Sequence, residues 1–216
     1  LWWREAEEHG VLPLDDRLVE LFGARFEDRT VHPANRRYTY RPPMSPLPAQ
    51  AGAALGGRGW DLTASVDRSA ADEGVLYASG TENAGFSIFV QDSRLTFDYN
   101  AFGDHTVLIS DREVPVGASR LTVKVRRTGS RTGTAEGLID DASCGGVDLP
   151  LFMMMMSSVG PSVGRDHGSP VSDRYRAPFP FSGRLHRVDI DADPEGKHQE
   201  LDGVAEAEQR AESARQ

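Results

Sequence analysis

Apolar and polar residues alternate strictly in the middle of the chain, and this period of two constrains the fold more than any other feature. The alternation is clearest in residues 95–100, which read Leu-Thr-Phe-Asp-Tyr-Asn. Because successive side chains of a strand point to opposite faces, the pattern predicts a strand with one buried face. Residues 86–90 precede it across the turn at residues 91–93. Together the two segments predict a β-hairpin.

Short segments with β character recur along the chain, with turn residues between them. They lie at residues 37–40, 60–67, 74–80, 107–109, 121–126, 134–140 and 184–190. Seven or more short strands at such spacing predict a sandwich or a barrel. The hairpin pattern and the closing run at residues 181–190 favour a mainly β fold, a concanavalin/laminin-G-like jelly-roll sandwich with short N-terminal helices.

The composition shifts along the chain and predicts four parts. Short helices are predicted for residues 1–29, and a Pro/Gly-rich strap for residues 30–59. The β-sandwich is predicted for residues 60–192, and an acidic tail for residues 193–216. The first helix carries Trp2 and Trp3, which are too large to leave exposed together. At least one of them is expected to pack on a neighbour, either this sandwich or another domain.

Charge and cysteine usage narrow the classes of function. The formal net charge is −9, which makes nucleic acid and anionic membranes poor partners. Cys144 is the single cysteine, so the chain predicts neither an internal disulfide nor a cysteine-based metal site. The six histidines are scattered and form no convincing ligand pair. We therefore predict no metal site and no cofactor in this chain.

Residues 151–156, Leu-Phe-Met-Met-Met-Met, form the strongest apolar run. A run of this length predicts a buried central strand. The alternative is an adaptable binding surface, because methionine side chains are flexible and polarisable.

Residues 163–190 combine a polar loop with a Pro-Phe-Pro-Phe segment. Phe179 and Phe181 are expected to lie on one side of an extended segment and to anchor the loop on a core. The loop contains Arg165, Asp166 and His167, and an Arg with an Asp can bind a carboxylate, a sulfate, a sugar hydroxyl or Ca²⁺. The alternative is a loop held by an Asp166–Arg ion pair and by backbone hydrogen bonds to Asp166.

This stretch resembles the C-terminal region of large bacterial arylsulfatases. In that family a segment of the form Gly-Arg-Asp-x-Gly-x-Pro-Val-Ser…Tyr…Pro-Phe-x-Phe-x-Gly closes a β-sandwich behind the sulfatase catalytic domain. Here the same pattern runs from Gly164 to Gly183 and includes Tyr175. Further matching pieces are residues 1–3 with 11–17, and residues 86–100, whereas residues 133–161 and the tail after Asp193 match poorly.

The resemblance implies a non-catalytic accessory domain that stabilises or shapes a sulfatase catalytic domain in the same polypeptide. Such a parent hydrolyses sulfate esters with Ca²⁺ and a formylglycine, which is made from the cysteine of a Cys-x-Pro-x-Arg motif. In this chain Cys144 is followed by Gly-Gly-Val-Asp, so the resemblance carries over a domain and not an active site.

The chain also opens within a predicted helix at Leu1, for which a processed N-terminus is the alternative and a piece of a longer protein is the favoured interpretation. On that reading Trp2, Trp3, Arg165, Asp166, His167 and Tyr175 are candidates for contact with another domain or a ligand. The isolated chain is then expected to self-associate through an apolar patch at residues 1–22, continued by the loop at residues 165–175.

The alternative function is a carbohydrate-binding module for sulfated glycans. Sugar binding favours a solvent-exposed aromatic platform beside polar groups. Trp60, Phe102 and Tyr175 are the aromatic candidates, and the sequence favours a packing role for each of them.

Overall fold

A computed structural model describes residues 36–153 and 159–194, together with the single positions 197, 200, 201, 203, 207 and 210. The predicted N-terminal helices, Trp2, Trp3 and Met154–Met156 lie outside the described residues, and the predictions made for them stay predictions. None of the helices among the described residues is long and apolar enough to cross a bilayer.

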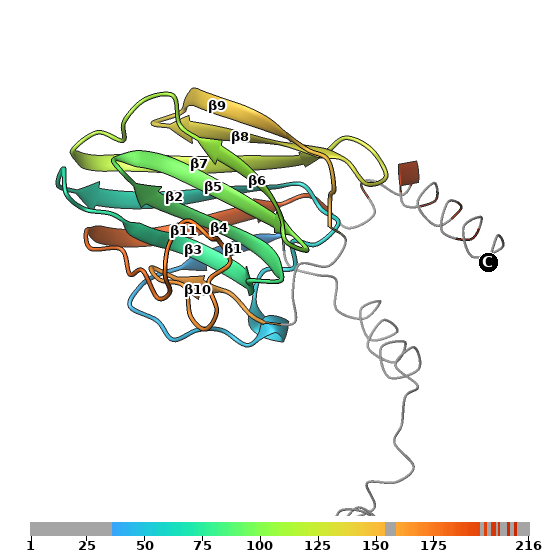
Figure 1. Cartoon of the computed structure of the whole chain (residues 1–216), viewed down its shortest axis with the longest axis horizontal. Coiled ribbons are helices and arrows are strands. Elements are labelled where there is room, and N and C mark those ends of the chain that lie inside the picture. Colours follow the sequence, from blue (N-terminus) through green and yellow to red (C-terminus); the bar gives the residue numbers. More distant parts are fainter. Residues whose placement is uncertain are drawn as a thin grey trace, which may run out of the picture. The chain divides into compact units, whose positions relative to one another are not determined.

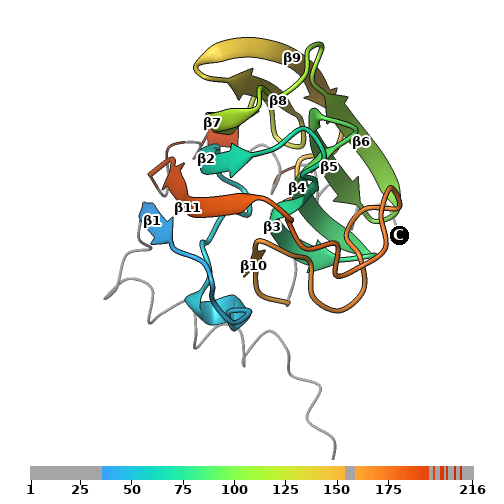
Figure 2. The same cartoon turned by 90° about the vertical axis from the view of Figure 1, so that its left-hand side faces the viewer.

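The described chain folds into two antiparallel sheets that pack face to face (Figures 1 and 2). The six-stranded sheet has the order β1 (Arg37–Tyr40), β11 (Arg184–Ala192), β2 (Trp60–Arg68), β7 (Gly117–Arg127), β8 (Gly133–Ile139) and β9 (Ala142–Leu149). The five-stranded sheet has the order β10 (Ser162–Val163), β3 (Gly74–Thr81), β4 (Ala84–Gln91), β5 (Arg94–Ala101) and β6 (Asp104–Ile109). A short 3₁₀ helix, η1 (Ala49–Ala51), lies in the connection between β1 and β2. The predicted mainly β, jelly-roll-like sandwich is confirmed.

The main core lies between the inner faces of the two sheets. Phe97 and Val123 are fully buried there, and Phe181 packs against the same cluster from its partly buried position. Trp60 stacks on Phe86 with 4.7 Å between the ring centroids, which confirms its packing role. The period-two alternation therefore identified the inward-facing residues of the strands correctly.

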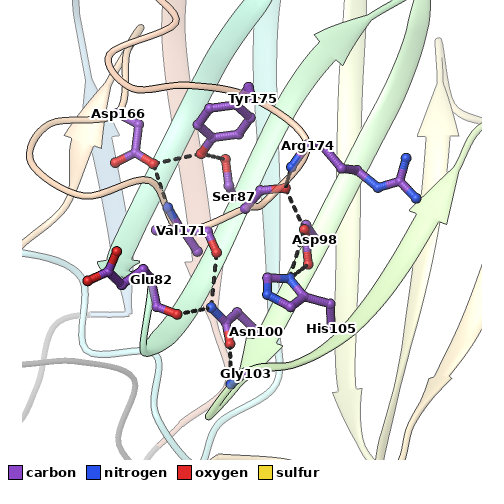
Figure 3. Close-up of polar contacts among 11 residues, drawn as sticks. Glu82, Ser87, Asp98, Asn100, Gly103, His105, Asp166, Val171, Arg174 and Tyr175 are labelled. Carbon is purple, nitrogen blue, oxygen red and sulfur yellow. Dashed lines mark hydrogen bonds and ion pairs between the residues drawn. The ribbon is translucent and has the colours of Figure 1, made fainter.

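The outer face of β5 differs from the prediction of one buried face. Thr96, Asp98 and Asn100 are all buried, although their side chains point away from the main core. The segment of residues 164–181, here named the covering loop, lies over β4 and β5 and shields Asp98 and Asn100 from solvent (Figure 3). The sequence of a strand does not reveal a cover that comes from a distant part of the chain.

The methionine run does not begin as a strand. Phe152 and Met153 are buried in irregular backbone, so the prediction of a central strand is wrong for residues 151–153. The Met153 N–H donates to the Tyr99 hydroxyl oxygen at 2.9 Å, and the Phe152 N–H donates to the carbonyl of Arg131. These backbone groups are satisfied outside any sheet ladder, so residues 152 and 153 pack without strand pairing.

Candidate functional site

The two ends of the covering loop are joined at a narrow neck. The Phe181 N–H donates to the Gly164 carbonyl at 3.0 Å, and the Gly164 N–H donates to Leu76 of β3 at 2.9 Å. The backbone of the loop passes so close to β3 that a side chain on Gly74 would clash with the Pro180 carbonyl oxygen. The neck therefore fixes the positions of the residues at both ends of the covering loop.

Asp166 anchors the first half of the covering loop from a buried position. Its Oδ2 accepts a hydrogen bond from the Val171 N–H at 2.9 Å and another from the Tyr175 hydroxyl at 2.6 Å. That hydroxyl also lies 2.8 Å from Oγ of Ser87 on β4 (Figure 3). Burial raises the pKa of Asp166 above its usual value, and the bonds from Tyr175 and Val171 partly offset this.

The predicted ion pair between Asp166 and an arginine does not form within the described part of the chain. Asp166 is satisfied by a backbone N–H and a phenol instead, whereas the predicted backbone hydrogen bond to it is present. Arg165 is exposed on the solvent side of the neck, so its guanidinium does not pair with the buried Asp166.

Asp98 of β5 anchors the second half of the covering loop and is completely buried. Its carboxylate accepts a hydrogen bond from Ser172 Oγ at 2.5 Å, and His105 Nδ1 of β6 lies 2.9 Å from its Oδ1 (Figure 3). The serine contacts the carboxylate and not the imidazole, so these three residues do not form the nucleophile–base–acid chain of a hydrolase. They hold the loop on the sheet.

Asp98, His105 and Asp173 are the residues here that come nearest to a cation site. One ligand atom from each of the three lies within 4.8 Å of the others. Both oxygens of Asp98 are already engaged by Ser172 and His105, and Asp173 is exposed. A cation would have to displace these hydrogen bonds, so the geometry favours a structural cluster.

Asn100 of β5 ties together three segments at one end of the sandwich. Its Nδ2 donates to the carbonyls of Glu82 and Val171 at 2.8 and 3.0 Å, and its Oδ1 accepts from the Gly103 N–H at 2.8 Å. These bonds satisfy the buried amide and fix the turn between β5 and β6 (Figure 3).

The apolar side of the covering loop packs on the outer face of the five-stranded sheet. Val171, Tyr175 and Phe179 contact Phe89 and its neighbours on β3 and β4, and the Tyr175 and Phe179 rings stack at 5.3 Å. Phe181 instead belongs to the main core. The prediction that both phenylalanines lie on one side is wrong, because the backbone at Phe179 has a positive φ of 37° and the segment is not regularly extended.

A cleft of about 480 Å³ opens beside the neck of the covering loop, where the strap, the neck and the start of β11 meet. It is lined by Pro42, Pro43, Met44, Val163, Gly164, Arg165, Pro180, Phe181, Gly183, Arg184 and Leu185. The lining is about equally polar and apolar, and Arg165 and Arg184 are its charged groups. Both arginines are exposed, and neither guanidinium makes a hydrogen bond or an ion pair with another described residue.

The structure separates the predicted site residues into two groups. Asp166 and Tyr175 are buried and hold the loop, whereas Arg165 faces the cleft and His167 is half-buried. Trp2 and Trp3 lie outside the described residues. Sequence reasoning missed Arg184, and the signal available for it was its position directly after the Phe-Ser-Gly segment that closes the loop.

The predicted packing role of Phe102 is also wrong. Its side chain is 73% exposed at the turn between β5 and β6, whereas Trp60 and Tyr175 are buried as expected. Phe102 occupies the turn with a positive φ of 60°, so its ring projects from the sheet and has no core to pack on.

Neither a family model nor a curated protein matches this chain in sequence. The carbohydrate-binding module CBM40 of Ruminococcus gnavus IT-sialidase is similar in structure, with a TM-score of 0.53 and 14% identity over 78% of this chain and 98% of the module. The leech intramolecular trans-sialidase gives a TM-score of 0.51 and 12% identity over 79% of this chain and 27% of the enzyme. A mutant of the NanB sialidase of Streptococcus pneumoniae gives a TM-score of 0.52 and 12% identity over 77% of this chain and 27% of the enzyme. These likenesses show that the chain has the β-sandwich fold that these proteins contain.

Proposed function

We propose that this chain is a non-catalytic carbohydrate-binding module that recognises acidic sugars. The observation that carries the proposal is the cleft beside the neck, where Arg165 and Arg184 lie without partners among the described residues beside the apolar side chains of the lining. The similar R. gnavus module has been solved with α2,3-sialyllactose bound, and that trisaccharide carries a carboxylate. This likeness supports the sugar class and says nothing about the position of the site.

The chemistry of the cleft suits a sugar with a carboxylate or sulfate group. A guanidinium binds the oxygens of either anion with two parallel hydrogen bonds, and such charge-assisted bonds are stronger than neutral ones. Pro42, Met44 and Phe181 offer apolar surface for the C–H faces of a sugar ring. The cleft volume of about 480 Å³ falls within the range of about 300–1,000 Å³ that is typical of ligand sites.

The buried polar network supports this function by fixing the backbone next to Arg165. Asp166 is locked by Val171 and Tyr175, and Ser162 Oγ donates to the Arg165 carbonyl at 2.7 Å. A backbone that is ordered before binding reduces the entropy that the ligand must offset. The remaining freedom belongs to the Arg165 side chain.

The test is a calorimetric titration with sialyllactose, a sulfated trisaccharide and the neutral trisaccharide that has the same backbone as the sulfated one. We expect one of the acidic sugars to bind and the neutral one to bind much more weakly. Replacing both Arg165 and Arg184 by Ala should reduce the affinity by about tenfold or more, because hydrogen bonds to charged groups contribute about 1.5–3 kcal/mol each. Arg131→Ala is the matched control, since Arg131 is exposed and does not line the cleft. Equal binding of the neutral trisaccharide, or unchanged affinity in the double variant, would contradict the proposal.

We also propose that the module accompanies a sulfatase catalytic domain in the same polypeptide. Its support is the sequence pattern from Gly164 to Gly183 together with the closing strand. A Cys-x-Pro-x-Arg motif is expected in the reading frame that precedes Leu1, and a long frame without it would contradict this pairing.

The formylglycine and Ca²⁺ of such a parent would belong to the catalytic domain. Cys144 does not fit the role of their precursor or ligand, because it is buried in β9 and burial raises the pKa of its thiol. The purified chain is therefore expected not to hydrolyse an aryl sulfate in the presence of Ca²⁺. Turnover that survives repurification and disappears in Cys144→Ala would contradict this expectation.

A further inference from the structure

The two arginines of the cleft beside the neck come from separate segments of the chain. Arg165 belongs to the covering loop and directly follows the neck residue Gly164, whereas Arg184 lies outside the loop, at the start of β11. The neck, where the Phe181 N–H donates to the Gly164 carbonyl at 3.0 Å, joins these two segments. The two guanidiniums are therefore not carried by neighbouring positions of one strand.

The backbone that carries each arginine is held in place. The Arg165 carbonyl accepts a hydrogen bond from Ser162 Oγ at 2.7 Å. On the other segment, Arg184 pairs with Asp67 in the ladder between β11 and β2, and a side chain on Gly183 would come within 3.0 Å of the Asp67 carbonyl oxygen. The spacing of the two positive charges is therefore set by ordered backbone and varies only with the side-chain torsions.

Neither positive charge of the cleft is compensated within the described chain. None of the described residues that line the cleft is acidic. Asp67 lies opposite Arg184 in the ladder, yet no ion pair joins these two described residues. The whole chain has a formal net charge of −9, so the cleft has the opposite sign to the chain that contains it. A cleft lined by charges of one sign concentrates ligands of the other sign.

We propose that this cleft selects sugars with two anionic groups, such as a sulfated uronic acid disaccharide, with one anionic group bound to Arg165 and the other to Arg184. This inference rests on the proposed acidic-sugar function and specifies its ligand class. A guanidinium can bind a carboxylate or a sulfate with two parallel hydrogen bonds, which makes the contact geometrically specific. Two guanidiniums on ordered backbone therefore distinguish both the number and the spacing of the anionic groups.

The test is a calorimetric titration of the purified chain with three forms of one disaccharide, in which glucuronate is linked to N-acetylgalactosamine. One form is unsulfated and carries one anionic group, and the other two carry a sulfate at O4 or at O6 of the galactosamine. We expect one sulfated form to bind about tenfold or more tightly than the unsulfated form, a difference of about 1.4 kcal/mol. The two sulfated forms should differ in affinity, because general charge attraction would bind both equally.

Single substitutions test whether each arginine holds one anionic group. Arg165→Gln and Arg184→Gln should each lower the affinity for the tighter sulfated form by about tenfold, to about the value of the unsulfated form. Each variant should still bind the unsulfated form, because one arginine remains for its carboxylate. Arg176→Gln is the matched control, since Arg176 is exposed on the covering loop and does not line the cleft. It should leave the preference for the sulfated form unchanged.

The outcomes separate this inference from the proposed function. If the unsulfated form or sialyllactose binds at least as tightly as both sulfated forms, the acidic-sugar function stands and the preference for two anionic groups is wrong. Loss of unsulfated-form binding in both single variants would show that the two arginines clamp one anionic group, which also overturns the inference. If no acidic sugar binds, the proposed function fails and this inference fails with it.

Discussion

The interior between the two sheets and the covered outer face of β4 and β5 are equally buried but differ in chemistry. The interior is filled by side chains such as Trp60, Phe86 and Phe97, which pack without hydrogen bonds between them. The covered outer face holds Asp98 and Asn100, and both are buried as completely as Phe97 is. The interior is stabilised by the apolar area removed from water. The covered face adds to its own apolar cluster around Phe89 a set of polar atoms, each of which must be satisfied once burial has taken it from water.

The difference predicts which amino-acid substitutions each of the two regions tolerates. Apolar packing is non-directional, so the interior should accept apolar exchanges that conserve volume. A buried polar network depends on the geometry of each bond, and a missing partner leaves the remaining groups unsatisfied. The covering loop is held by such bonds, so the placement of Arg165 depends on the less tolerant region.

The largest expected effect is in the interior. Phe97→Ala removes a fully buried ring at the centre of the aromatic cluster and should lower the free energy of unfolding by about 3–5 kcal/mol. Urea denaturation monitored by tryptophan fluorescence measures it. A decrease below about 1 kcal/mol would show that Phe97 does not face the main core.

The next largest effect is expected at the centre of the polar region. Asp98→Ala leaves Ser172 and His105 without their buried acceptor and should cost about 2–3 kcal/mol, with the covering loop losing order. Asp67→Ala is the matched control, because Asp67 is exposed on β2. Equal stability of the two variants would mean that the outer face behaves as a solvated surface.

A smaller effect is expected where the loop meets β4. Tyr175→Phe keeps the ring packed on Phe89 and removes the hydroxyl that lies between Asp166 and Ser87, at an expected cost of about 1–2 kcal/mol. A double-mutant cycle with Ser87→Ala should show coupling of about 0.5 kcal/mol or more. Additive effects would show that the contact between Tyr175 and Ser87 contributes nothing.

The contrast between these two regions also explains how far the sequence alone could predict the structure. Alternation placed Phe97 and Val123 in the core correctly, because burial between two sheets follows the local period of each strand. The same alternation assigned Asp98 and Asn100 to solvent, since nothing within β5 reveals that residues 164–181 return to cover it. The position of Arg184 after the Phe-Ser-Gly segment was the available signal, but its proximity to Arg165 could not be predicted, because only the closure of the loop brings both residues to one cleft. Phe102 was misassigned because aromatic residues are usually buried, and the turn at residues 102–103 lacks the usual Asn-Gly.

The smallest and most specific effect is the pH dependence of the polar region. Burial raises the pKa of Asp166 above its ordinary value of 3.8, so the folded chain holds this proton more tightly than the unfolded chain does. The stability that Asp166 contributes is therefore fully present below pH 3.8 and is lost as the pH rises through its folded-state pKa. Asp166→Asn cannot ionise, while its amide oxygen can still accept hydrogen bonds from Val171 and Tyr175.

The free energy of unfolding of Asp166→Asn, relative to the wild-type chain, should accordingly increase as the pH rises above 3.8 and then level off. Denaturant titrations of both proteins at a series of pH values measure this difference, and the titration of all other groups cancels in it. Ile88→Val, in the apolar interior, is the control that should give a pH-independent difference. A flat difference for Asp166→Asn would show that its carboxyl ionises as easily in the folded chain as in water. The loop would then be open to solvent, and the contrast between the two regions would not hold.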